Sequence, residues 1–362
     1  MRHYTCPKCF RRYLVGQYNY LCGNEACVNC RDHDHPVKAG GRFSPTPICS
    51  ACGRELSVRL CPGCGAELPA GVETGQECAI SVIGGEQAGK SHYLAVLINQ
   101  LKNEIGKAFD CTLYAQGGDK TLRHYEQAYY KPLFVEKHCL ESTREESLEP
   151  LYYSLVFGNR KKGKNTNLTF YDTCGGNFED ARLLEQFNQS IVHSKGLLFL
   201  IDPMELPRLR EYTGQSGGEE QASHAGDILT RVIHLIRSQS KMGSLSRKIP
   251  IPIAVCLTKI DKLEKFLDVS SCLRYPSRLL EPGSFDSIEF HNTSLEVQSM
   301  LEGWSDRQLI NQITSQFEKY AFFGISALGA DPQPSGAVSR PVPLHTADPL
   351  LWLLWTNGSL SF

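Results

Sequence analysis

The 362-residue sequence has no hydrophobic run long enough to cross a membrane. A membrane-spanning helix needs about 20 apolar residues, whereas the best candidate, PLLWLLW at 349–355, is far shorter and predicts a buried helix. The first ten residues, MRHYTCPKCF, also lack the apolar core of a secretory signal. We therefore expect a soluble, cytoplasmic protein.

The sequence also lacks an excess of charge of either sign. Its 38 Lys and Arg residues nearly balance its 39 Asp and Glu residues, for a formal net charge of −1. A near-neutral chain has no overall basic field that would draw it to nucleic acid or to an anionic membrane. Length alone predicts roughly two domains of ordinary size.

Aliphatic residues are scarce in the first 70 positions, which are rich in cysteine instead. Nine of the 15 cysteines lie between Cys6 and Cys64. Such a segment cannot bury a core large enough to fold by itself. In a reducing compartment, C-x-x-C pairs favour metal binding over disulfides. The sequence therefore predicts small zinc ribbons, with zinc supplying the missing folding energy.

The cysteine spacing predicts two structural zinc sites. Two C-x-x-C pairs eight residues apart predict one site in a ribbon at 41–72, and a second site is expected in a ribbon at 1–40. The predicted ligands are Cys49, Cys52, Cys61 and Cys64 for the former site and Cys6, Cys9, Cys27 and Cys30 for the latter. Cys22 remains an alternative to Cys30. Four thiolates leave no open coordination position, so neither site is expected to be catalytic.

Residues 76–362 alternate short apolar strands with amphipathic helices, which predicts an α/β domain with a mostly parallel sheet flanked by helices. Strands are expected at 78–83, 151–157, 168–172, 197–202, 251–257 and 321–326, and helices at 91–105, 181–192, 223–238, 304–319 and 348–355. The hairpin-like link between 157 and 168 predicts an antiparallel edge strand. Stretches at about 106–150, 207–222 and 262–300 fit no regular element and are predicted insertions.

A complete phosphate-binding loop, GGEQAGKS at Gly84–Ser91, follows the first apolar strand of this domain. Its glycines allow backbone N–H groups to converge on an anion where the next helix begins. Lys90 is expected over the β- and γ-phosphates, and the Ser91 hydroxyl in the Mg²⁺ shell. The remaining predicted nucleotide-binding residues of the loop are Gly84, Gly85, Glu86, Gln87, Ala88 and Gly89.

Three further patterns follow predicted strands in chain order. Asp172, in DTCG, is placed to hold Mg²⁺ through water, and the Gly175 amide to reach the γ-phosphate. In TKID, Thr258, Lys259 and Asp261 form a base site whose carboxylate can accept two hydrogen bonds from guanine. Adenine cannot supply that pair of donors. Ser326, Ala327 and Leu328 are placed to donate a backbone N–H to guanine O6.

Together GGEQAGKS, DTCG, TKID and SAL resemble the motifs of a Ras-like, translation-factor-related P-loop GTPase. The ending RPVPLHTADPLLWLL is also similar to that of double-GTPase proteins associated with bacterial conflict systems. The resemblance implies GTP or GDP with Mg²⁺ as cofactors. The sequence departs from the usual pattern of these GTPases at the catalytic glutamine, and its switch I threonine is ambiguous. Gly176 stands where many such GTPases place a water-orienting glutamine. The switch I threonine is predicted to be Thr143, with Thr121 and Thr112 as alternatives.

These features predict a GTP-binding switch with slow Mg²⁺-dependent hydrolysis and zinc ribbons that recruit a protein partner. The alternatives are a pseudo-GTPase that holds nucleotide without hydrolysis, and a nucleotide-dependent zinc-ribbon factor for nucleic acid. The last rests on the mixture of basic and aromatic residues near the first C-x-x-C pair.

Overall fold

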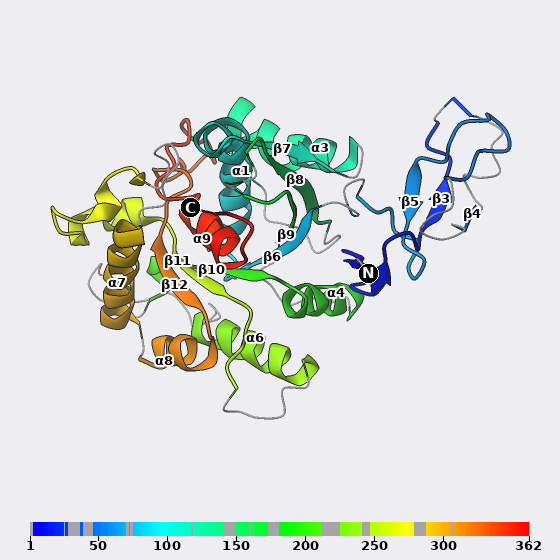
Figure 1. Cartoon of the computed structure of the whole chain (residues 1–362). Coiled ribbons are helices and arrows are strands. Elements are labelled where there is room, and N and C mark those ends of the chain that lie inside the picture. Colours follow the sequence, from blue (N-terminus) through cyan, green and yellow to red (C-terminus); the bar gives the residue numbers. More distant parts are fainter. Residues whose placement is uncertain are drawn as a thin grey trace.

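The protein, seen here as a computed structural model, has an α/β domain with a small N-terminal module beside it (Figure 1). The structure describes residues 3–24, 26–27, 37–38, 46–69, 72, 75–116, 119–140, 149–159, 161, 163–172, 181–206, 208–210, 225–240, 247–278, 287–305 and 307–361. Among these, no helix combines the length and the apolar character needed to cross a membrane.

The α/β domain is built on a seven-stranded sheet in the order β12-β11-β10-β6-β9-β8-β7. Five strands are parallel: β6 (Gln76–Gly84), β9 (Thr166–Asp172), β10 (Gly196–Ile201), β11 (Ile253–Leu257) and β12 (Tyr320–Gly324). β8 (Leu151–Phe157) runs antiparallel both to β9 and to β7 (Cys111–Ala115). The predicted fold class is confirmed. The predicted antiparallel strand exists, but β7 rather than β8 forms the edge.

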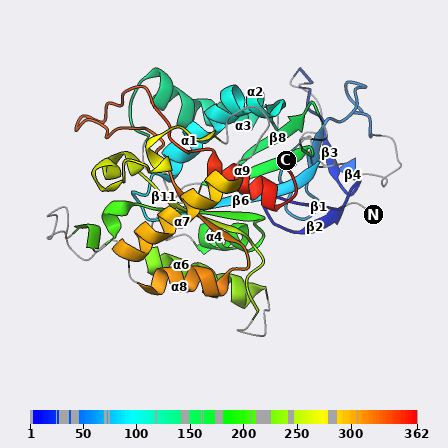
Figure 2. The ribbon, with the colours of Figure 1, turned by 60° about the vertical axis from the view of Figure 1, so that its left-hand side comes forward.

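The strands are apolar on both sides because helices cover both faces of the sheet. One face packs against α1 (Lys90–Gln100) and α9 (Asp348–Thr356). The other packs against α4 (Ala181–Val192), α6 (Ala225–Gln239) and α8 (Arg307–Gln316). Figure 2 shows α6 and α8 together on one side of the sheet and α1 on the other.

The buried helix α9 lies directly on the central strands. A Cβ on Gly196, at the start of β10, would come within 2.8 Å of the Leu353 side chain of α9. Glycine therefore allows this helix to approach the sheet closely. The sequence prediction of a buried helix at 348–355 agrees with α9, whose Leu350, Leu351, Leu353 and Leu354 are all buried.

Two of the three stretches predicted to fit no regular element do contain helices or strands. Between α1 and β8 lie the π-helix η2 (Leu101–Ile105), α2 (Gly106–Phe109), β7, α3 (Asp119–Tyr125) and the π-helix η3 (Glu126–Val135). These elements form because Tyr125, Tyr129 and Leu133 pack into the core under α1. The third stretch contains most of η5 (Ile260–Phe266), η6 (Cys272–Arg274) and most of α7 (Ser287–Trp304). Most of 207–222 lies outside the described residues.

The N-terminal module, residues 3–69, is held by short strands with little aliphatic core. β1 (His3–Thr5) pairs with β2 (Arg12–Leu14), and β3 (Asn19–Leu21) pairs with both β4 (Val37–Lys38) and β5 (Val58–Leu60). Its buried cluster consists mainly of cysteines and tyrosines. The predicted shortage of aliphatic core is therefore visible in the packing.

Candidate nucleotide site and cysteine clusters

The phosphate-binding loop lies between β6 and α1, as the sequence predicts. Gly84 has φ +154°, and a Cβ there would come within 2.4 Å of the Leu200 carbonyl of β10. Gly89 has φ +82° and precedes the first turn of α1. Both positions therefore require glycine. Glu86 and Gln87 are exposed at the tip of the loop.

Lys90 is buried beneath this loop and holds its backbone. Its Nζ donates hydrogen bonds to the Gly85 carbonyl at 2.6 Å and to the Gly84 carbonyl at 3.1 Å. The lysine therefore places a positive charge inside the turn where the N–H groups of an anion site converge.

Asp172, at the end of β9, lies close to the start of α1. Burial raises the pKa of its carboxyl group. The Ser91 hydrogen bond and the Lys90 charge lower this pKa, but burial outweighs them. Tyr129 of η3 donates a 3.0 Å hydrogen bond to Oδ2. Oδ1 is buried and accepts no hydrogen bond from the described residues. A hydroxyl and a carboxylate with an unused oxygen fit Mg²⁺ and its water shell.

Two acidic residues after β10 border the same loop. Asp202 forms an ion pair with Lys259 and accepts a hydrogen bond from the Met204 N–H. Glu205 lies over the loop, where a Cβ on Gly85 would come within 2.7 Å of its Oε1. Burial and the nearby Asp202 raise the pKa of Glu205, while Lys259 and Lys90 oppose that increase. Glu205 was not predictable from the sequence, because nothing in a PMEL segment indicates contact with a loop 120 positions earlier.

The residues of the predicted base site also meet. The Ser326 hydroxyl donates a 2.5 Å hydrogen bond to Asp261 Oδ1, and the Thr258 hydroxyl donates to the Ile201 carbonyl. Lys259 adopts φ +52° and extends to Asp202 beside the phosphate-binding loop. Ala327 and Leu328 follow Ser326, half-buried. Asp261 and Ser326, 65 residues apart in the sequence, thus meet at the carboxyl ends of β11 and β12, and we call this pair the Asp261–Ser326 corner.

His92 links this region to the segment that precedes residues 141–148. Its Nε2 accepts a hydrogen bond from the Leu140 N–H at 3.2 Å. Burial and the Lys259 charge lower the pKa of His92 to about 4, so the ring is neutral near pH 7 and can accept. No motif in the sequence indicates this role of His92.

Two predicted phosphate-sensing residues, Thr143 and Gly175, lie outside the described residues, as does Gly176. Of the alternatives to Thr143, Thr112 is exposed on edge strand β7 and Thr121 is buried in α3. The roles assigned to all these residues stay predictions.

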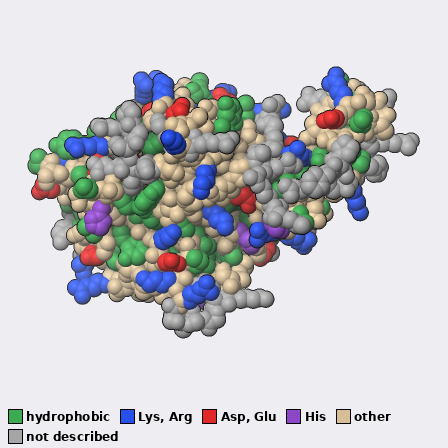
Figure 3. Space-filling view, viewed as in Figure 1, with side chains coloured by type: hydrophobic (Ala, Val, Ile, Leu, Met, Phe, Trp, Pro, Cys, Tyr) green, Lys and Arg blue, Asp and Glu red, His purple; other side chains and the backbone are tan. Residues whose placement is uncertain are grey.

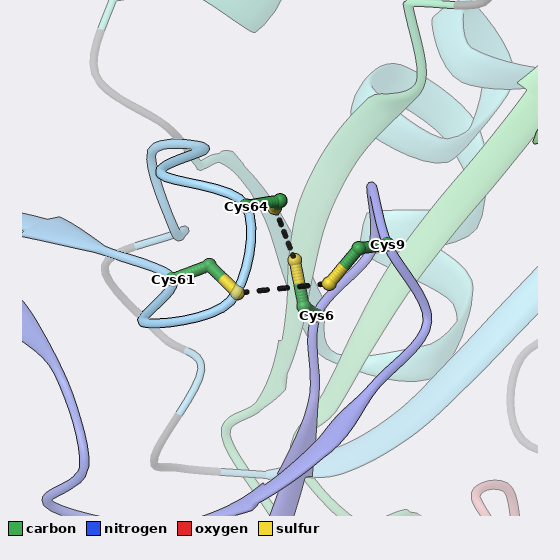
Figure 4. Close-up of side chains that lie close together, drawn as sticks. All are labelled: Cys6, Cys9, Cys61 and Cys64. Carbon is green, nitrogen blue, oxygen red and sulfur yellow. Dashed lines mark hydrogen bonds between the residues drawn. The ribbon is translucent and has the colours of Figure 1, made fainter. Parts of the chain in front are cut away.

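Eight cysteines of the N-terminal module form two four-sulfur clusters. We name the clusters by the order of their cysteines along the sequence. The outer cluster contains the first and last pairs, Cys6, Cys9, Cys61 and Cys64, and the inner cluster contains the cysteines between them, Cys22, Cys27, Cys49 and Cys52. Figure 4 shows the sulfur atoms of the outer cluster pointing toward one another. The Sγ atoms of Cys6 and Cys64 are 3.7 Å apart, as are those of Cys9 and Cys61. Tetrahedral Zn–S bonds of about 2.3 Å separate sulfurs by about 3.8 Å, so this geometry fits zinc.

The predicted grouping of the zinc ligands is wrong. Each cluster takes one cysteine pair from residues 1–40 and one from 41–72, and Cys22 occupies the place predicted for Cys30, which lies outside the described residues. The reason is the antiparallel pairing of β3 with β5, in which Leu21 lies opposite Val58 and Asn19 opposite Leu60. This pairing brings Cys22 toward the 49–52 turn, and Cys61 toward the chain that carries Cys6 and Cys9.

The outer cluster also contacts the α/β domain. Phe10, directly after Cys9, packs against Tyr171 and His193, with ring centroids 5.6 Å and 5.4 Å apart. The Tyr171 hydroxyl donates a 2.8 Å hydrogen bond to the Pro7 carbonyl, and the Thr5 N–H donates to Glu77 at 2.7 Å. Tyr171 is the residue before Asp172, so the strand that carries the candidate magnesium ligand also contacts the segment that carries Cys6 and Cys9.

A phosphate-binding loop after a buried strand, with the other motifs at the carboxyl ends of parallel strands, defines a GTPase-type α/β fold. The chain belongs to the Double-GTPase 2 family, whose model matches residues 78–313. The predicted family resemblance is thereby confirmed.

Individual relatives are more distant. The chain is 24% identical over 401 aligned positions to "Putative ESX-1 scaffolding and assembly protein SaeC" of Mycolicibacterium smegmatis, covering 98% of each chain. It matches the Arl6 BBS3 small GTPase of Trypanosoma brucei at 12% identity and a TM-score of 0.32, over 79% of this chain and 100% of that one. It also matches the Ski7 GTPase-like domain of S. cerevisiae at 18% identity and a TM-score of 0.37, over 78% and 50% of the two chains.

Proposed function

We propose that this protein is a GTP-binding switch with slow Mg²⁺-dependent hydrolysis, in which the N-terminal module acts as an adaptor for a protein partner. The main support is the convergence of Lys90, Asp172 and the Asp261–Ser326 corner along one edge of the sheet. Their order along this edge suits the phosphates, the metal ion and the base of a nucleoside triphosphate.

In this proposal the chain's own groups bind and orient the nucleotide. Lys90 leaves the Gly84 and Gly85 carbonyls to neutralise phosphate charge, and Ser91 and Asp172 hold the metal site. Bound Mg²⁺ would offset the negative charge that develops on the transferred phosphoryl group. Asp261, kept in place by Ser326, accepts hydrogen bonds from guanine, and Lys259 supports the base plane.

Slow hydrolysis follows from Gly176, which offers no side chain to orient the attacking water. An arginine supplied by a partner raises the rate of such enzymes by about 10³–10⁵-fold. A single-turnover assay on the pure protein tests this proposal. It predicts slow release of phosphate, and rapid release without a partner would contradict it.

The adaptor role is supported by the contact between the outer cysteine cluster and Tyr171, next to Asp172. If exchange of GDP for GTP moved the segment after Asp172, it would also shift Tyr171 and so change the packing between Tyr171 and Phe10. The distant relative named for scaffolding and assembly is compatible with a partner-binding role. A cytoplasmic location and a link to bacterial conflict systems stay predictions from the sequence.

Nucleotide titrations test the proposed function as a whole. Purified protein with its zinc content measured should bind GTP and GDP tightly in the presence of Mg²⁺ and bind ATP much more weakly. About two zinc ions per chain are expected if both four-thiolate clusters are filled. Tighter binding of ATP than of GTP would contradict the base assignment.

A second candidate is a pseudo-GTPase that holds nucleotide as a structural cofactor, favoured by the same Gly176. The two functions differ in their response to nucleotide state. A switch binds its partner with different affinity in the GDP and GTP-analogue states, whereas a scaffold binds it equally in both.

A further inference from the structure

A groove lies between the N-terminal module and the α/β domain, at the end of the sheet opposite the nucleotide site. Its volume is about 620 Å³, and its lining includes Ala79 of β6, Thr169 of β9 and Ile251 before β11. Ligand-binding clefts commonly measure about 300–1,000 Å³. The groove is therefore large enough for several side chains of a bound segment.

The floor of the groove is apolar and comes from both parts of the chain. Phe10 is contributed by the module, and Cys78, Tyr171 and Ile236 by the α/β domain; all four are buried. Because Phe10 and Tyr171 pack on each other, the floor depends on the docking of the outer cluster. Such a floor suits an apolar side chain rather than a fully hydrated ion.

The rim of the groove is basic. Arg12, Lys195 and Arg247 are exposed there, and His3 and His193 add two imidazoles. Figure 3 shows basic and histidine side chains gathered where the module meets the α/β domain. Among the described residues of the lining there is one carboxylate, that of Glu77, which accepts the Thr5 N–H. Three cations against one carboxylate give the groove an excess of positive charge, although the whole chain carries −1.

These features favour a peptide over a nucleic acid strand. Proteins hold single strands by stacking bases on exposed aromatic faces. Here Phe10 packs between Tyr171 and His193, and both Phe10 and Tyr171 are buried, so their faces are already used. An acidic peptide with an apolar side chain needs only the apolar floor and the basic rim.

We propose that this groove binds an acidic, extended segment of a protein partner, with an apolar side chain on the Phe10–Tyr171 floor and carboxylates facing Arg12, Lys195 and Arg247. The proposal rests on the adaptor role given above and specifies its docking site. Tyr171 adjoins Asp172 in β9, so the groove floor and the candidate magnesium ligand belong to neighbouring residues of one strand, whose side chains point to opposite faces of the sheet.

Selection from a random twelve-residue peptide library tests the proposal directly. The full-length, zinc-loaded protein is the target, and the double variant R12E/R247E reverses two exposed rim charges. K107E is the matched control, because Lys107 is exposed on α2 and does not line the groove. Selected peptides are then measured by fluorescence anisotropy with GDP and with a GTP analogue, and a twelve-nucleotide DNA strand is measured in parallel.

The proposal predicts that the protein and K107E enrich peptides rich in Asp and Glu with one or two large apolar residues. R12E/R247E should bind these peptides at least tenfold more weakly while it binds GTP normally. Absence of acidic enrichment, equal binding by R12E/R247E, or equal binding of the DNA strand would overturn it. Normal GTP binding in that case would leave the GTPase assignment intact, whereas a failure of all variants to bind GTP would refute the proposed function instead.

Discussion

Phe10 has a backbone conformation that glycine adopts in two corresponding turns of the module. The residue after Cys9 has φ +57°, and the glycines after Cys52 and Cys64, Gly53 and Gly65, have φ +68° and +70°. A left-handed conformation costs a non-glycine residue about 1–2 kcal/mol. The phenylalanine ring offsets that cost by packing against Tyr171 and His193.

Replacing Phe10 by glycine should therefore loosen the docking of the module without disrupting the cysteine cluster. The substitution relieves the backbone but removes a buried aromatic ring, whose burial contributes about 1.5–3 kcal/mol. Hydrogen exchange along β9 should become faster while the measured zinc content stays unchanged. Unchanged exchange would show that this ring does not hold the two parts together.

Tyr129 is the second residue whose role emerges only in three dimensions. Tyr129→Phe removes one of the hydrogen bonds that the buried Asp172 carboxyl group accepts. Because such a loss costs about 1–3 kcal/mol, denaturant unfolding should show a lower free energy of unfolding, and Mg²⁺-dependent nucleotide affinity should change as well. Tyr114→Phe, on exposed β7, is the control and should leave both unchanged.

At the scale of elements, His345 joins the start of α9 to η6. Its Nδ1 lies 2.8 Å from Asp348 Oδ2, and its Nε2 lies 2.9 Å from the Tyr275 carbonyl and 3.2 Å from that of Cys272. Burial lowers the pKa of His345, but the Asp348 carboxylate and the two carbonyls outweigh burial and raise it above 6.5. The charged ring, which can donate from both nitrogens, is thus favoured in the folded protein.

A raised pKa for a histidine makes stability depend on pH in one direction. The contribution of His345 is fully present below pH 6.5, the value for an ordinary histidine, and is lost as pH rises through the raised pKa. Urea unfolding below and well above pH 6.5 should show this loss in the wild type and a smaller pH effect in His345→Gln. An equal pH dependence in the two proteins would contradict the assignment.

Strands and helices of the α/β domain were predictable because they carry strong local patterns. The helix expected at 181–192 agrees with α4, and all six expected strands occur with small shifts at their ends. The elements between 106 and 135 were missed because η3 contains Pro132 and its apolar side chains follow no simple helical period. Packing of Tyr125 and Leu133 against the core stabilises this region instead.

The candidate site was predictable where motifs follow strands and unpredictable where distant elements meet. Asp172, Asp261 and Ser326 each end or follow a strand, so their common edge follows from a parallel sheet. Tyr129 and Glu205 reach the site from segments without a motif. The cysteine grouping failed because proximity in sequence suggested local pairs, whereas the β3–β5 pairing decides which turns meet.

For the molecule as a whole, the two parts should respond differently to loss of zinc. The module has only a small cluster of cysteines and tyrosines as its core, so a chelator should unfold it. The nucleotide groups lie between Gly84 and Leu328 in a sheet with its own core, so guanine nucleotide binding should persist. Circular dichroism and nucleotide titration after chelation check both outcomes, and complete loss of nucleotide binding would contradict this division.

The central claim is that Asp261 selects guanine in a pocket formed by the phosphate-binding loop and the Asp261–Ser326 corner. The most direct test is Asp261→Asn, measured by competition among GTP, xanthosine triphosphate and ATP. Because the amide donates where the carboxylate accepts, GTP affinity should fall by about 10²-fold, equivalent to about 2.7 kcal/mol, and xanthosine triphosphate should become the preferred ligand. Unchanged preference for GTP in the variant would contradict the account.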